Sequence, residues 1–182
     1  MNIFQCISYC IVKALTEIVK FVFFISIEKM ESHTLIMGLG NVLMGDEGIG
    51  VHSIEYLKDK KIPEGVDLLD GGTGGFHLLS LFNQYNHLIL IDATISKSTP
   101  GEVKILRPRF ASDFPRSLTS HDIGLKDLVQ TAELLHELPD IHLVTVNIKD
   151  LRDVGIGLSE TLCDSMEKVY RAVMEILGKL DD

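Results

Sequence analysis

The sequence predicts an α/β fold: a three-layer α/β/α sandwich around a mostly parallel, five-stranded twisted sheet. Two observations lead to this prediction. From residue 34 onward, short apolar runs alternate with segments that have helical spacing. One of these runs, HLILI at 87–91, is continuously apolar, as expected for a central strand covered on both faces. Such alternation favours parallel strands joined by crossovers, with helices on both sides of the sheet.

In the first half of the fold, glycine and aspartate mark the strand ends. The strand predicted at 34–39 runs into GLGN (38–41), and apolar residues at helical spacing predict a helix at 49–60. The strand at 66–69 stops at DGGTGG (70–75), and a short helix follows at 76–81. The strand at 87–91 ends at Asp92.

The second half continues the same alternation. A strand at 102–106 is entered through Pro100 and Gly101, and apolar spacing predicts a helix at 123–138. A strand is predicted at 141–148 and a long amphipathic helix at 159–180. Ser159 is the expected N-cap of this helix, and Gly178 is its expected C-terminal stop.

Composition and charge limit the kind of protein. The chain has 182 residues, of which 46% are hydrophobic and 24% charged, which excludes disordered, collagen-like and coiled-coil classes. A net charge of −9 argues against nucleic acid and against stable anchoring to an anionic membrane, because both are bound through Lys and Arg. Three cysteines without a CxxC pair predict a reducing, cytoplasmic location.

The first thirty residues differ from the rest, so the predicted organisation is an apolar or amphipathic extension at 1–30 and one domain at 31–182. Lys13, Glu17 and Lys20 argue against a membrane span, because a central Lys alone costs about 3 kcal/mol. A signal peptide is disfavoured by the lack of an early positive region and of a cleavage site. The three charges share one helical face, which allows an amphipathic helix on the domain or on a membrane surface. In a second interpretation, the domain starts at Met30 and residues 1–29 are an over-extended start.

Acidic residues follow three successive predicted strands, so we expect them at one edge of the sheet. They are Glu47, Asp70 and Asp92, and His121 begins a later helix that can reach the same edge. Glu47, Asp92 and His121 together form a partial ligand set for a borderline divalent metal ion. The set is too poor in His and Cys for a permanent structural zinc site. Structural alternatives are helix capping for Asp46 and Glu47, and turn or loop formation for the other two aspartates.

A nucleotide-binding alternative rests on GLGN, which resembles a dinucleotide-binding turn. Leu43 stands where the third glycine of GxGxxG is required, and Asp46 and Glu47 would repel a pyrophosphate at the helix N-terminus. Asp70 does imitate the acid that binds a ribose, so this alternative stays open.

Five segments together carry a family resemblance: GLGNVLMGDEGIGV (38–51), DGGTGGFHLL (70–79), LIDA (90–93) leading to PGEV (100–103), TSHDIGL (119–125) and GIGLSETL (155–162). In this order and spacing, the chain resembles the maturation endopeptidases of nickel–iron hydrogenases over nearly the whole of 34–180. Residues 1–30 have no counterpart in the family pattern. Thr119 stands where the family usually has Ser.

The resemblance implies a hydrolase, an endopeptidase of aspartic or metal-dependent type. Such enzymes remove a C-terminal extension from the precursor of the hydrogenase large subunit once nickel has been inserted. The family's metal-contacting positions fall on Glu47, Asp92 and His121, and a further suspected catalytic acid falls on Asp70, as a general base. Nickel is expected to arrive with the substrate, so the free enzyme is expected to be metal-free.

Several alternatives stay open on the sequence. The nickel acts as a Lewis acid, lowers the pKa of a water molecule, or serves as a recognition anchor alone. A non-cleaving, nickel-sensing chaperone of the same precursor would use the same ligands. So would a self-sufficient metallopeptidase that carries its own zinc or nickel.

Overall fold

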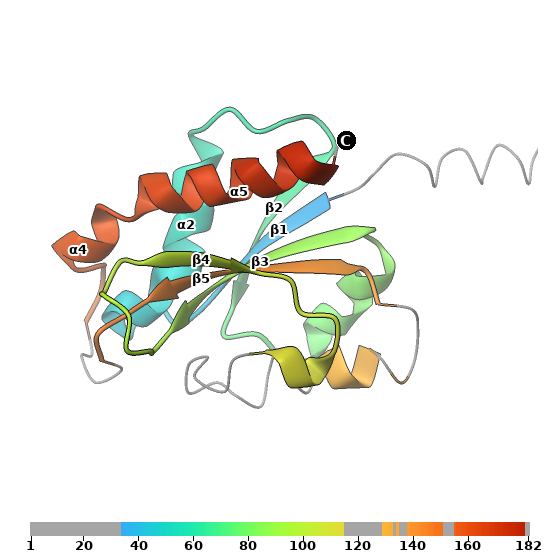
Figure 1. The fold of residues 1–182 in the computed structure, drawn as a ribbon, viewed down its shortest axis with the longest axis horizontal. Helices are drawn as coiled ribbons and strands as arrows, with labels where there is room; N and C mark the ends of the chain where they lie inside the picture. Colours follow the sequence, from blue (N-terminus) through green and yellow to red (C-terminus); the bar gives the residue numbers. More distant parts are fainter. Residues whose placement is uncertain (1–33, 115–128, 133, 135–137, 151–154, 181–182) are drawn as a thin grey trace, which may run out of the picture. The chain divides into compact units, whose positions relative to one another are not determined.

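A five-stranded sheet organises the chain in the computed structural model, which describes residues 34–114, 129–132, 134, 138–150 and 155–180. The strand order is β2-β1-β3-β5-β4 (Figure 1). The strands are β1 (Thr34–Leu39), β2 (Val66–Gly72), β3 (His87–Thr94), β4 (Val103–Leu106) and β5 (Asp140–Asn147). The first three and β5 run parallel, whereas β4 pairs antiparallel with β5 at the edge. The predicted α/β fold with a mostly parallel, five-stranded sheet is therefore confirmed.

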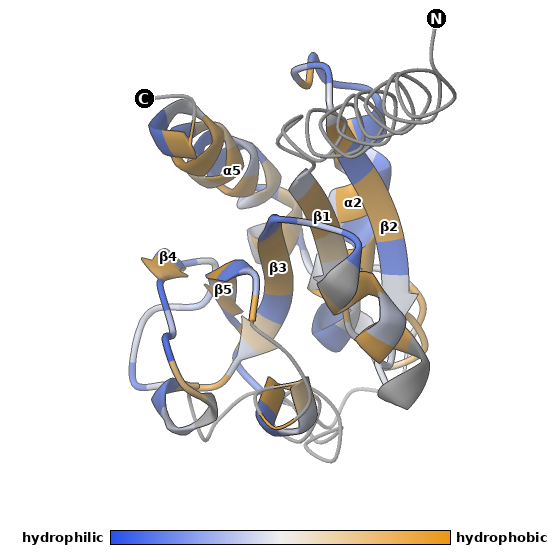
Figure 2. Cartoon of the chain, turned by 90° about the vertical axis from the view of Figure 1, so that its right-hand side faces the viewer, coloured by the Kyte–Doolittle hydropathy of each residue, from blue (hydrophilic) through white to orange (hydrophobic). Residues whose placement is uncertain are grey.

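Both faces of the sheet are covered by a hydrophobic core. Consecutive strand residues point to opposite sides, so each strand contributes side chains to both cores. Ile36, Ile89 and Val144 belong to the core on the side of α2 (Ile49–Lys58) and α5 (Met166–Leu180). Leu35, Leu90 and Leu143 belong to the core on the other side, with η2 (Phe76–Asn83) and the helical residues 129–132. Figure 1 shows α2 and α5 on one side of the sheet and η2, in green, on the other, and Figure 2 shows hydrophobic residues along β1 and β3.

Three predicted elements differ from the structure. The strands β2 and β3 run past their predicted ends, because pairing continues at Leu39↔Gly72 and at Thr94↔Asn147. The predicted single helix 159–180 is two helices, α4 (Glu160–Cys163) and α5, with the fully buried Ser165 between them donating its hydroxyl to the Leu162 carbonyl (2.7 Å). Gly178 does not stop α5, which continues to Leu180.

The predictions for residues 1–30 and for most of the helix at 123–138 concern residues outside the described ranges. Within the part of the chain that the structure describes, no helix combines the length and hydrophobicity needed to cross a membrane.

Candidate functional site

The strand connections reverse direction at β1, so the carboxyl ends of β1 and β3 form the switch point of the sheet. The chain runs from β1 to β2 on one side and then returns to β3 on the other side. Ligands of open α/β sheets bind at such a switch point, outside the carboxyl ends of the strands. The short helix η1 (Gly45–Gly48) follows β1 there, and Asp92 lies in β3.

Four glycines allow the backbone at the start of α2 to pack directly against these strand ends. A Cβ atom on Gly38 would lie 2.1 Å from the Gly50 carbonyl oxygen, and one on Gly40 would lie 2.1 Å from the Glu47 carbonyl oxygen. On the helix side, a Cβ on Gly48 would lie 2.9 Å from Val42 Cα, and one on Gly50 would overlap strand carbonyls. The glycine spacing that suggested a nucleotide turn is therefore explained by direct contact between backbones.

Glu47 is buried beside this backbone contact. The residue is 1% exposed and directly precedes Gly48, the N-cap of α2. The residue therefore stands next to a helix N-terminus, the part of a nucleotide-binding fold that binds the phosphate. Fully buried glutamates are rare, and they recur where a site needs the charge.

Asp92 is the second buried acid of this edge, at 5% exposure. It was expected to end the strand, but β3 continues through Thr94, and Asp92 stands opposite Thr145 of β5. By strand alternation it shares a face with Leu88 and Leu90, away from α2. Its Oδ1 accepts a hydrogen bond from the backbone N–H of the next residue, Ala93 (2.7 Å).

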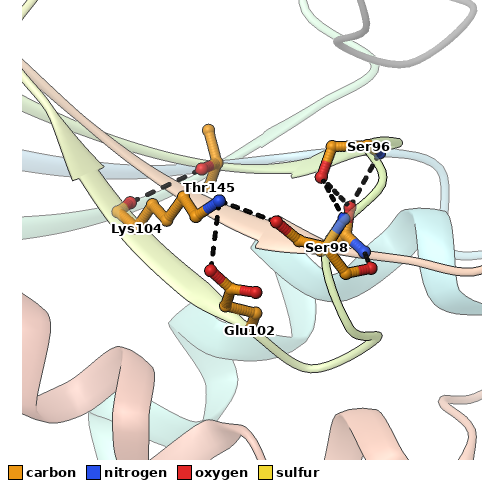
Figure 3. Close-up of polar contacts among 6 residues, drawn as sticks. Ser96, Ser98, Glu102, Lys104 and Thr145 are labelled. Atoms are coloured by element: carbon orange, nitrogen blue, oxygen red, sulfur yellow. Dashed lines mark hydrogen bonds and ion pairs between the residues drawn. The ribbon is translucent and has the colours of Figure 1, made fainter.

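The loop that leaves β3 after Asp92 is fastened to the end of β5. The buried Asn147 accepts hydrogen bonds at Oδ1 from the Ser96 N–H and hydroxyl, both at 2.8 Å, and its Nδ2 donates to the Ser98 carbonyl (2.6 Å). Lys104 donates to the Ser98 hydroxyl (2.7 Å) and pairs with Glu102 (3.1 Å; Figure 3). These contacts hold the end of β3, and therefore Asp92, in one position.

The side chain of Asp46, the neighbour of Glu47, is hydrogen-bonded to a distant segment of the chain. Its two carboxylate oxygens accept hydrogen bonds from the backbone N–H (2.7 Å) and the hydroxyl (2.8 Å) of Ser159. Ser159 is the N-cap residue of α4, but its side chain makes no capping bond and turns to Asp46 instead. The segment just before it is also tied to the η1 loop, since the Gly45 N–H donates to the Gly155 carbonyl (2.8 Å). Sequence reasoning singled out both segments but did not predict that they meet.

Asp70 lies at the end of β2, where it pairs with Gly38, and its side chain is exposed. Its Oδ1 accepts the Gly72 N–H (2.8 Å), and Gly72 has a φ of 53°. This is the local loop bond that the structural alternative expected. The catalytic role of Asp70 stays a prediction.

His121 falls outside the described residues, so the structure describes only Glu47 and Asp92 of the three predicted metal ligands. Among the residues with a described placement, no group of three or more His, Cys, Asp or Glu side chains is arranged to hold a metal ion. The set of Glu47, Asp92 and His121 therefore stays a prediction.

Two further histidines, His87 and His142, lie near the amino ends of β3 and β5. His87 Nδ1 is 3.8 Å from Asp140, at the start of β5 and thus at the opposite edge of the sheet. His142 is buried beside them, and burial lowers its pKa below the ordinary value, against the opposing effect of the Asp140 charge.

Comparisons with known proteins agree on one family. Residues 51–176 match the family described as HycI, hydrogenase maturation protease. The chain is 34% identical over 146 residues to the hydrogenase 2 maturation protease of Escherichia coli (strain K12), covering 79% of this chain and 89% of that protein.

Solved structures give the same result. The hydrogenase maturating endopeptidase HybD from E. coli is similar with a TM-score of 0.67 and 35% identity, over 79% of this chain and 93% of that one. The [NiFe] hydrogenase maturation protease HybD from Thermococcus kodakarensis is similar with a TM-score of 0.66 and 26% identity, over 79% and 98% of the two chains.

Proposed function

This chain belongs to the hydrogenase maturation protease family, and we propose that it is the endopeptidase that removes a C-terminal extension from the nickel-loaded precursor of a nickel–iron hydrogenase large subunit. The observation that carries this proposal is the pair of buried carboxylates, Glu47 and Asp92, at the switch point of the sheet. The names of the relatives, which include a [NiFe] hydrogenase maturation protease, support the choice of substrate.

In this proposal, nickel belongs to the substrate and serves as its recognition element. The carboxylates of Glu47 and Asp92 and the imidazole of His121 complete the coordination of an ion that the precursor already holds through thiolates. Oxygen and imidazole ligands suit such a borderline ion. A precursor without nickel lacks this anchor, so selectivity follows from the difference in affinity between the two forms.

The reaction is hydrolysis of a peptide bond. The oxygen of a water molecule adds to the scissile carbonyl carbon, the C–N bond breaks, and a proton from the water ends on the leaving amine. The proposed general base is Asp70, whose side chain is exposed at the carboxyl end of β2 and is therefore accessible to a substrate. Nickel either polarises the carbonyl or the water as a Lewis acid, or acts as the anchor alone.

A direct test incubates the nickel-loaded precursor with the enzyme and follows the mass of the large subunit. The native chain is expected to shorten it, whereas Glu47→Gln, Asp92→Asn and His121→Ala are expected to leave it intact without loss of fold. The matched control is Glu55→Gln, because Glu55 is an exposed glutamate on α2 that pairs only with Lys58 among the described residues. Full activity in all three site variants would refute the site. A native chain that binds the precursor but leaves it uncut would favour the chaperone.

A further inference from the structure

Three exposed apolar side chains gather on the two loops beside Glu47. They are Val42, Leu43 and Ile156, which together are called the rim surface, with exposures of 36%, 59% and 89%. Within the described ranges, only two other large hydrophobic side chains are exposed, Phe110 and Leu134. Three of the five therefore lie on one short pair of loops.

The backbone below the rim surface is fixed. The two loops form a parallel bridge at Met44↔Gly155, and the Gly155 N–H donates to the Leu43 carbonyl (3.1 Å). The bonds from Ser159 to Asp46 fasten the same pair of loops a few residues further on. Exposed apolar side chains that lie together, rather than singly, are typical of a protein-binding surface.

We propose that the rim surface docks the folded precursor of the hydrogenase large subunit while its C-terminal extension reaches the switch point of the sheet. This inference rests on the proposed function. A protease must contact its protein substrate around its site, and Leu43 lies four residues before Glu47 on the same loop. The rim surface is therefore continuous with the area that the substrate has to touch. Its uncharged, aliphatic character calls for an apolar patch on the precursor as the complement.

The test compares cleavage kinetics of the double variant Leu43→Ser/Ile156→Ser with those of the native chain, using the nickel-loaded precursor. Because two contact side chains are lost without a change in the acids, KM is expected to rise about 10-fold while kcat stays within about two-fold. Phe110→Ser is the control, because Phe110 is 62% exposed and follows β4 near the opposite edge of the sheet, where Arg107 pairs with Asp140. Its KM is expected to match that of the native chain. Melting curves are recorded for each variant to check that it folds.

The outcomes separate this inference from the proposed function. If the native chain cleaves and the double variant has an unchanged KM, or if Phe110→Ser raises KM equally, then the docking surface is wrong and the protease activity stands. If the native chain leaves the precursor uncut, then both fall. Sedimentation of the enzyme alone tests a second copy as occupant: a dimer that the double variant abolishes would overturn the proposal.

Discussion

Replacing Gly50 with alanine is expected to reverse the usual effect of that substitution in a helix. Alanine normally stabilises a helix relative to glycine by about 0.5–1 kcal/mol. At Gly50, however, the added Cβ would lie 2.2 Å from the Leu39 carbonyl oxygen and 2.3 Å from the Ile91 carbonyl oxygen. Both are backbone atoms of central strands and cannot rotate away, so the first turn of α2 has to move off the sheet.

The magnitude follows from the two opposing effects. Overpacking a close-packed site costs about 1–3 kcal/mol, and the upper part of this range applies where backbone has to shift. After subtraction of the helix-propensity gain, the free energy of unfolding of Gly50→Ala should fall by about 2 kcal/mol, which lowers the melting temperature by about 4–8 °C in a chain of this length. Cleavage should be lost as well, because Glu47 is three residues away in the displaced segment.

Gly178→Ala is the matched control. Gly178 is also a helical glycine, in α5, but no heavy atom lies within 4 Å of the Cβ that would be added. This variant should be more stable than the native chain by about 0.5 kcal/mol, with unchanged cleavage. Urea unfolding followed by circular dichroism measures both variants. Equal or greater stability of Gly50→Ala relative to the native chain would refute the backbone-contact argument.

Three further results are expected. Asp46→Ala removes both hydrogen bonds from Ser159 and should lower the free energy of unfolding by about 1 kcal/mol in a urea titration. The loss is small because the pair is partly solvated. An unchanged free energy of unfolding would show that these two bonds do not stabilise the fold. Burial lowers the pKa of His142 below its ordinary 6.5, so the unfolded chain binds more protons as the pH falls below that value, and stability should decrease there. In His142→Gln this decrease should be smaller when unfolding is measured at several pH values, and an identical pH profile would contradict the assignment. Treatment of the enzyme alone with a chelator should leave cleavage of the nickel-loaded precursor unchanged, whereas loss of activity would favour a resident metal.

The sheet was predictable because its strands are apolar runs between glycines and aspartates. The extension of β3 through Asp92 was not, because its last residues do not read as a strand, and only pairing with β5 reveals it. The placement of Glu47 just after β1 and of Asp92 late in β3 was predictable, since the carboxyl ends of parallel strands share one edge. The bonds from Asp46 to Ser159 join residues 113 positions apart, and two polar residues carry no periodic signal that would connect them.

The contrast between the adjacent acids separates folding from function at this edge. Asp46 has a structural role, because its hydrogen bonds with Ser159 connect η1 to the start of α4. Glu47 is buried, and a buried ionic group can often be replaced by an apolar one of similar volume without loss of stability. A chain shaped by stability alone would therefore have no need of a carboxylate at this position. Its presence near the switch point, with Asp92 buried in the neighbouring strand β3, supports the proposed contact with a cation that the substrate brings.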